Sequence, residues 1–234
     1  AISEFVRRRI GKAYRREAEV VYPPVDVERF TPDDGASRGD YYVTASRLVP
    51  YKRVDLLVRA FAHLPDRRLV VVGDGPELAR VRALAGPNVE LRGRLPHDAL
   101  LAELRAARAF LFAAVEDFGI APIEAQAVGT PVIAFARGAA PETVRGLDDA
   151  APTGAFFHEP TPEAVAAAVR TFEREAHRVS PEACRANAAR FAVPRFRAEF
   201  DAFVRRAWAD FVDAGSARPD VARLLATAGG PDAQ

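Results

Sequence analysis

Short apolar runs alternate with amphipathic segments between residue 40 and residue 157. The short runs predict buried strands, and the segments with apolar residues every three or four positions predict helices. Strands are expected at 41–45, 69–72, 89–91, 109–113, 131–135 and 155–157, and helices at 54–64, 77–84, 98–107, 121–128 and 141–144. This alternation predicts an α/β fold, a Rossmann-like doubly wound parallel sheet with helices on both faces.

The segments on either side of this region follow another pattern. Before it, the sequence predicts a basic helix at 3–18, a short strand at 19–22 and a polar loop at 31–40. After residue 161, helices are expected at 162–173, 181–191 and 194–212. The last of these carries apolar side chains at helical spacing, which indicates a packed face: they are Phe196, Phe200, Phe203, Ala207 and Phe211. Residues 214–234 are small and polar, with one weak helix expected near 221–226.

Composition narrows the classes of protein. Of the 234 residues, 49% are hydrophobic, which is enough for a packed core, and the net charge of +1 argues against a protein built to hold nucleic acid. Cys184 is the one cysteine and the four histidines are scattered, so the sequence offers neither a disulfide framework nor ligand spacing for a metal. No apolar run reaches membrane-spanning length and no signal peptide is visible, so a cytoplasmic location is expected. Because the chain contains no methionine, even at position 1, we interpret it as a piece of a longer protein.

The loop at 116–124 carries the strongest chemical pattern. It joins the strand expected at 109–113 to the helix expected at 121–128, and it reads Glu-Asp-Phe-Gly-Ile-Ala-Pro-Ile-Glu. Gly119 lets the backbone approach a ligand, and Pro122 suits the first helical position. The free N–H groups of a helix start bind anions, while Glu116 and Glu124 suit hydroxyl groups. The combination predicts a site for a sugar nucleotide, and the alternative is a solvated Glu116 with Glu124 as a helix-dipole partner.

A second loop, at 45–53, supplies positive charge. Arg47 follows the strand expected at 41–45, and Lys52 precedes the helix expected at 54–64. Lys52 is one of only two lysines among 33 basic residues. A guanidinium grips two phosphate oxygens and an ammonium adds a point charge, so the pair would neutralise a leaving diphosphate. A solvated basic loop is the competing interpretation.

Three further loops follow strands and therefore belong to the same sheet edge. Residues 72–77 read Val-Gly-Asp-Gly-Pro-Glu, which is a tight turn that lacks the third glycine of a dinucleotide fingerprint. Residues 91–96 include Arg94 and Leu95, which could line a base pocket. Residues 137–143 include Gly138, and Glu142 there is expected to favour the start of its own helix.

Together, these motifs resemble the nucleotide-sugar-binding half of GT-B glycosyltransferases of family 4. The resemblance runs from about Ser3 to about Phe203 and is carried by four segments, 22–26, 46–53, 72–77 and 116–124. Within that family the chain resembles the WbaZ-like mannosyltransferases, for which the sequences Tyr-Pro-Pro-Val-Asp, Ser-Arg-Leu-Val-Pro-Tyr-Lys-Arg and Glu-Asp-Phe-Gly are typical. The resemblance implies a retaining transferase that needs no metal and no cofactor other than its nucleotide-sugar donor.

The resemblance also implies roles for individual residues. Arg47 and Lys52 match the pair that binds the donor diphosphate. Glu116 matches the catalytic glutamate beside the donor sugar, and Glu124 matches the glutamate that takes the ribose hydroxyls. The turn that contacts sugar and phosphate through its amides is formed by Phe118, Gly119, Ile120 and Ala121. Arg94 and Leu95 match the loop near the base.

The family pattern implies a domain organisation and partners. Residues 1–18 would be an interdomain helix from a missing N-terminal acceptor domain, 19–193 the nucleotide-sugar-binding domain, 194–213 a helix packing toward the missing domain, and 214–234 a flexible tail. The acceptor would be a glycan or a lipid-linked molecule. The chain alone would bind donor without catalysing transfer, and its basic first helix would permit peripheral contact with the inner face of the cell membrane.

Three functions remain in competition on the sequence. The first is the donor domain of a glycosyltransferase, with GDP-mannose as the donor favoured by the resemblance. The second is a nucleotide-sugar-binding module without catalysis. The third is a doubly wound dehydrogenase, which the missing third glycine at 72–77 disfavours.

Overall fold

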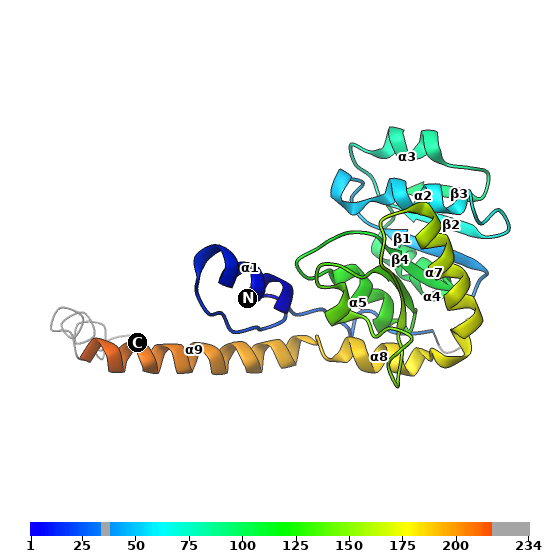
Figure 1. Ribbon diagram of the computed structural model, residues 1–234. Helices are drawn as coiled ribbons and strands as arrows, with labels where there is room; N and C mark the ends of the chain where they lie inside the picture. The colour runs from blue at the N-terminus through cyan, green and yellow to red at the C-terminus, as the bar shows by residue number, and fades with distance from the viewer. Residues whose placement is uncertain (34–37, 217–234) are drawn as a thin grey trace. The chain divides into compact units, whose positions relative to one another are not determined.

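The computed structural model of the protein describes residues 1–33 and 38–216. In these residues, six strands form one parallel sheet in the order β3-β2-β1-β4-β5-β6 (Figure 1). The strands are β1 (Tyr41–Ala45), β2 (Arg68–Val72), β3 (Val89–Gly93), β4 (Ala109–Phe112), β5 (Val132–Phe135) and β6 (Gly154–Phe157). The predicted Rossmann-like doubly wound sheet is therefore confirmed.

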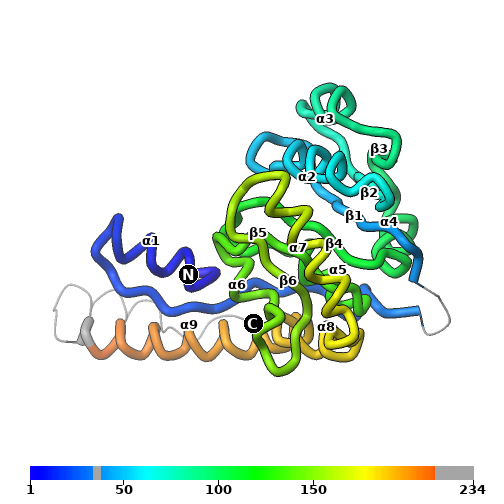
Figure 2. The backbone as a smooth tube through the Cα atoms, turned by 45° about the vertical axis from the view of Figure 1, so that its right-hand side comes forward, coloured from blue at the N-terminus to red at the C-terminus, as the bar shows by residue number. Residues whose placement is uncertain are grey.

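Two helical layers cover this sheet (Figure 2). One face packs against α2 (Val54–Phe61), α3 (Leu78–Leu84) and α7 (Pro162–Glu175). The other packs against α4 (His97–Ala106), α5 (Ile120–Ala127) and α8 (Pro181–Ala189). Neighbouring residues of a strand point to opposite faces, so Tyr42 joins the first layer and Val43 the second. Burial on both sides explains why the central strands β4 and β5 read as continuous apolar runs, whereas β3 alternates between half-buried and exposed residues.

The shorter elements are the helix α1 (Glu4–Tyr14), the turn η1 (Pro50–Lys52), the short helix α6 (Ala140–Thr143) and the turn η2 (Ala176–Arg178). The predicted first helix ends four residues early, because Arg15 adopts a left-handed conformation with φ of 53° and its N–H bonds to the Gly11 carbonyl. This is a helix-terminating geometry.

The prediction of a strand at 19–22 is wrong. The N–H of Val21 bonds to the carbonyl of Ala1, and the terminal ammonium bonds to the carbonyl of Glu19, so this segment runs beside the start of the chain. A single parallel bridge forms further on, between Val25 and Ala192. The two prolines at 23 and 24 have no N–H to donate, which explains why no ladder forms before it.

The chain divides into two compact units, residues 1–193 and residues 194–234. The second contains most of α9 (Val193–Ser216), in which Phe196 and Phe200 stack at 5.4 Å between ring centroids. The helix expected near 221–226 lies outside the described residues. None of the described helices is both long and apolar enough to cross a membrane.

Candidate functional site

The candidate site lies at the carboxyl ends of β1 and β4. These strands are neighbours in the sheet, although β2 and β3 come between them in the sequence, so the connections run outward from this point in both directions. At such a switch point the two loops diverge and leave a crevice. The loop after β1 contains Arg47 and Lys52, and the loop after β4 contains Glu116.

Two adjoining cavities occupy this edge. The first, of about 570 Å³, is lined by Arg47, Arg94 and Leu95 among others, and the second, of about 450 Å³, by Lys52 and Glu116. Both are also lined by the same four residues, Ala45, Ser46, Ala121 and Glu124. The structure therefore brings the residues expected near a base and those expected near a sugar to opposite ends of one hollow.

Lys52 and Glu116 form an ion pair at the floor of the second cavity. Their side chains are 19% and 16% exposed, so both are largely shielded, yet water still reaches them. Lys52 ends the η1 turn, whose first position is Pro50, and its ammonium lies 5.4 Å from the centre of the Tyr51 ring. The proline fixes its own φ, which limits the conformations of the turn that carries Lys52.

The loop after β5 packs against the backbone of Glu116. The N–H of Ala139 donates to the carbonyl of Glu116 at 3.0 Å. A Cβ on Gly138 would lie 2.5 Å from that same oxygen, so only glycine permits this approach. The loop at 137–140 thus fixes the backbone of Glu116 rather than lining either cavity.

The turn after Glu116 presents its backbone to the second cavity. Phe118 is only 5% exposed, and its ring packs against Tyr22 and Phe191 with centroids 6.1 and 5.5 Å away. Its side chain therefore anchors the turn, while Gly119, with φ of 88°, is the N-cap directly before α5. No side chain caps this helix start within the described structure, so its first N–H groups are open to an anion.

The helix α5 (Ile120–Ala127) begins one residue earlier than the predicted range of 121–128. Pro122 is its third residue rather than its first, a position that still needs no intrahelical N–H bond. Glu124 directly follows Ile123 in α5 and lines both cavities. Burial raises the pKa of Glu124 above its ordinary value, which makes its ionised form costly until a ligand supplies hydrogen bonds.

The loop after β2 packs against the loop after β1. A Cβ on Gly73, whose φ is 138°, would lie 1.8 Å from the carbonyl oxygen of Ser46. The N–H of Leu48 also donates to the carbonyl of Asp74 at 2.9 Å. The glycines at 73 and 75 therefore allow the backbone of the loop after β2 to lie against the backbone of the loop after β1. Both glycines line the first cavity together with Arg47.

Ser46 is a cavity residue that the sequence analysis did not single out. It lines both cavities, and across the described residues its hydroxyl oxygen is buried without a hydrogen-bond partner. A buried hydroxyl without a partner is unfavourable, so a ligand or water is expected to satisfy it. Its place next to Arg47, directly after a strand, is the signal that could have identified it.

Glu142 has a different partner from the one expected. Its carboxylate accepts the N–H groups of Glu4 and Phe5, both at 2.8 Å, and therefore caps α1 rather than serving only its own helix. It also accepts the Tyr22 hydroxyl at 3.1 Å. Burial, and then the charge of Glu142, raise the pKa of Tyr22 to about 12.

No cluster of three or more potential metal ligands occurs within residues 1–33 and 38–216. The predicted site residues combine three cations, two carboxylates and an open helix start. Cations and amides suit a diphosphate, and carboxylates suit hydroxyl groups.

The chain matches a protein-family model. The model of the family described as "Glycosyl transferases group 1" matches residues 31–191. Among curated proteins, the chain is 37% identical over 172 residues to a GDP-mannose-dependent monoacylated alpha-(1-6)-phosphatidylinositol monomannoside mannosyltransferase of Corynebacterium glutamicum, covering 61% of this chain and 45% of the relative. It is 36% identical over 173 residues to a GDP-mannose-dependent alpha-(1-6)-phosphatidylinositol monomannoside mannosyltransferase of Mycobacterium tuberculosis, covering 62% and 45%. The chain thus spans less than half the length of these relatives.

Solved structures share the fold. A sucrose-phosphate synthase from Thermosynechococcus elongatus matches with a TM-score of 0.76 at 22% identity, covering 90% of this chain and 58% of that one. The Anabaena protein HepE, in complex with UDP and glucose, matches with a TM-score of 0.74 at 21% identity, covering 88% and 62%.

Proposed function

The chain belongs to the group 1 glycosyl transferases, and from this membership we propose that it is the donor-binding half of a retaining mannosyltransferase. The donor in this proposal is GDP-mannose, and the acceptor is a glycan or a lipid-linked molecule. One observation carries the proposal: Arg47, Lys52, Glu116 and Glu124 meet around two adjoining cavities at the switch point of the sheet. Because the chain spans 45% of its curated relatives, transfer by the whole protein is part of the proposal.

The leaving group determines what the cations do. When the bond between the sugar and the diphosphate breaks, negative charge develops on the diphosphate. Arg47, Lys52 and the open start of α5 would stabilise this charge, and preorganised donors of this kind contribute about 3 kcal/mol each at other active sites. The role needs no metal, because fixed cations and amides take its place.

The carboxylates have separate roles in this proposal. Glu124 is shared by both cavities and would accept the ribose hydroxyls, which would compensate for the burial of its charge. Glu116 would orient the donor sugar from the second cavity and favour the positive charge that develops on the ring. We assign Glu116 an electrostatic role and not that of a nucleophile.

The choice of donor and acceptor draws on the relatives. Relatives with 36–37% identity are named for GDP-mannose and for phosphatidylinositol mannosides, which supports mannose transfer to a lipid-linked acceptor. The first cavity supports a nucleoside: it has apolar walls from Leu95, Leu100 and Phe110, with Arg94 at its edge. Such a pocket would take a base between apolar side chains.

Calorimetric titration of the chain with GDP, UDP and ADP tests the donor. We expect GDP to bind most tightly and GDP-mannose to bind at least as well. Equal, weak binding of all three would overturn the choice of guanine, and no binding would overturn the nucleotide site. Mannose transfer by the natural protein that contains this chain should be lost in Glu116→Ala, whereas unchanged transfer would favour a nucleotide-sugar-binding module without catalysis.

A further inference from the structure

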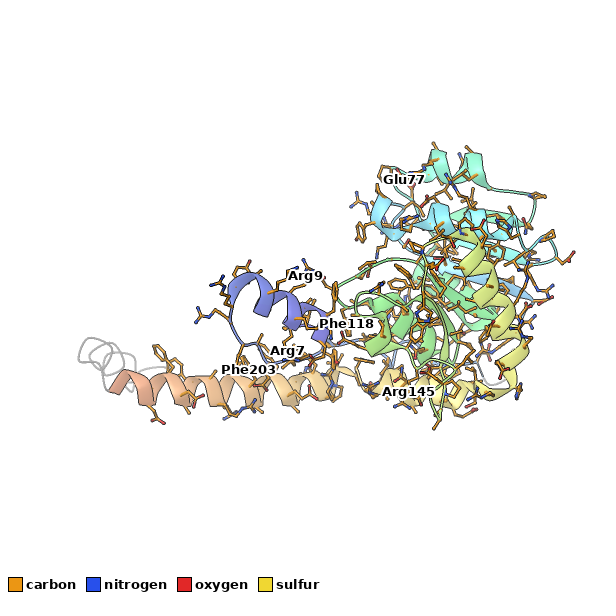
Figure 3. The ribbon with its side chains drawn as sticks, in the orientation of Figure 1. Arg7, Arg9, Glu77, Phe118, Arg145 and Phe203 are labelled. Carbon is orange, nitrogen blue, oxygen red and sulfur yellow. The ribbon has the colours of Figure 1, made fainter. Side chains whose placement is uncertain are left out.

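The loop after β2 carries two carboxylates in different environments. Glu77 lies just before α3 (Figure 3), pairs with Arg80 at 3.1 Å, and is not among the residues that line the first cavity. Asp74 lines that cavity, and within the described residues it belongs to no ion pair. Asp74 is therefore a charged group without a counter-ion in the cavity where the base is expected.

Asp74 and Arg94 stand side by side at the ends of two neighbouring strands. The N–H of Gly73 donates to the carbonyl of Gly93 at 2.7 Å, which joins the end of β2 to the end of β3. Asp74 directly follows the first glycine and Arg94 the second, and both line the first cavity. In the part of the chain that the structure describes, Arg94 also belongs to no ion pair. The cavity wall thus presents a group that only accepts hydrogen bonds next to a group that only donates them.

The backbone holds Asp74 in this position. The N–H of Leu48 donates to the carbonyl of Asp74 at 2.9 Å, and an added Cβ on Gly75 would collide with the carbonyl of Leu48. One carboxylate oxygen of Asp74 accepts the N–H of Gly75 at 2.7 Å. Each oxygen of a carboxylate has two lone pairs, so both can still accept a hydrogen bond from a ligand.

This order of acceptor and donor matches the edge of guanine. Guanine carries an acceptor at O6, with the donors N1–H and N2–H2 beside it. A guanidinium donates to O6, and the two oxygens of a carboxylate accept from N1–H and N2–H2. Adenine would place its N6 amino group against the arginine and its N1 acceptor against the carboxylate. Uracil would place its O2 carbonyl against one carboxylate oxygen, and such contacts leave polar groups unpaired.

We propose that Asp74 selects guanine as the base of the donor by accepting N1–H and N2–H2, while Arg94 donates to O6. The apolar side chains of Leu95 and Leu100, which line the same cavity, would hold the faces of the ring. This inference rests on the proposed function, because it requires the base to lie in the first cavity. Asp74 would determine the specificity of donor binding and would take no part in the transfer step.

Calorimetric titration of the chain with GDP and IDP tests the proposal, because IDP lacks only the N2 amino group. The test variant is Asp74→Asn, which keeps the size of the side chain but replaces an acceptor oxygen with an amino group. The matched control is Glu77→Gln, which removes the other carboxylate of the same loop. Arg94→Gln is a third variant, since O6 is present in both nucleotides.

We expect the parent and Glu77→Gln to bind GDP at least about tenfold more tightly than IDP, the effect of one hydrogen bond to a charged group. In Asp74→Asn the two affinities should agree within about twofold, because the contact with the N2 amino group is gone. Arg94→Gln should weaken both nucleotides and keep their ratio. Equal binding of GDP and IDP by the parent, or an unchanged ratio in Asp74→Asn, would overturn the proposal.

Failure of this inference can be distinguished from failure of the proposed function. If the parent binds no nucleoside diphosphate, or binds UDP as tightly as GDP, the guanine donor is wrong and the role of Asp74 is wrong with it. If the parent prefers GDP and the preference survives in Asp74→Asn, only the role of Asp74 is wrong. The melting temperature of each variant should match that of the parent, because Asp74 and Arg94 are exposed.

Discussion

The ammonium of Lys52 and the carboxylate of Glu116 meet across the switch point, although 64 residues separate them in the sequence. One comes from the loop after β1 and the other from the loop after β4. Each is assigned to a different part of the same donor, the diphosphate and the sugar. Without a ligand, the two side chains neutralise each other as an ion pair. A bound diphosphate would compete with Glu116 for Lys52.

Lys52→Ala should weaken the binding of nucleoside diphosphate by about 10- to 100-fold, the effect of one hydrogen bond to a charged group. Calorimetric titration with GDP measures this. Arg59→Ala is the control, because Arg59 is an exposed cation on the neighbouring helix α2. Unchanged affinity in Lys52→Ala would reject its phosphate role.

Glu116→Gln should strengthen the binding of GDP by about fivefold. The change removes a carboxylate that pairs with Lys52 and repels the phosphates, and a net energy of about 1 kcal/mol is the upper end of what ion pairs in contact with water contribute. The same titration measures it. If GDP instead binds more weakly to Glu116→Gln, Glu116 positions the ammonium rather than competing for it.

Gly73→Ala should abolish nucleotide binding and lower the melting temperature, because its Cβ would lie 1.8 Å from the Ser46 carbonyl. Gly93→Ala is the control, since Gly93 also has a positive φ but has no atom within 4 Å of the added Cβ. Gly93→Ala should therefore cost only the strain of a positive φ, about 1 kcal/mol. Equal effects in the two variants would show that close packing at Gly73 is not essential.

Much of the fold could be predicted because its signals are local. The run at 69–72 is apolar at every position, and a strand buried on both faces needs nothing else. The signals for helix starts are also local. At α7, Thr161 is the N-cap and Pro162 is the first helical residue. The predicted positions of helix ends are less accurate. At Arg15, for example, the residue type gives no sign of the left-handed conformation that ends α1.

The arrangement of the site depended on contacts between distant residues. Glu142 caps a helix that lies more than 130 residues earlier in the chain, and only the folded structure brings the two together. The ring of Phe118 could equally have faced the cavity, and its burial depends on Tyr22 and Phe191. Residue types thus indicated which loops form the site, and tertiary packing decided which atoms face it.

Glu142→Gln should destabilise the protein by about 1–2 kcal/mol, because a neutral amide has only one oxygen for the two N–H groups at the start of α1. Chemical denaturation measures the loss, and Glu159→Gln, at an exposed position, is the control. The pKa of Tyr22 should fall from about 12 but stay above its ordinary value, because burial is the larger cause. Ultraviolet titration against Tyr22→Phe isolates this hydroxyl, and an unchanged pKa would contradict the contact.

Glu124→Gln should increase stability at neutral pH and weaken nucleotide binding. Burial raises the pKa of Glu124 in the folded state, so the folded protein holds this proton more tightly than the unfolded chain does. The resulting stabilisation is present below the ordinary glutamate pKa and is lost as the pH rises through the raised value. The amide is never ionised, so the melting temperature of Glu124→Gln should exceed that of the parent by an amount that grows as the pH rises above the ordinary glutamate pKa. A difference independent of pH would mean that Glu124 does not carry this burial cost.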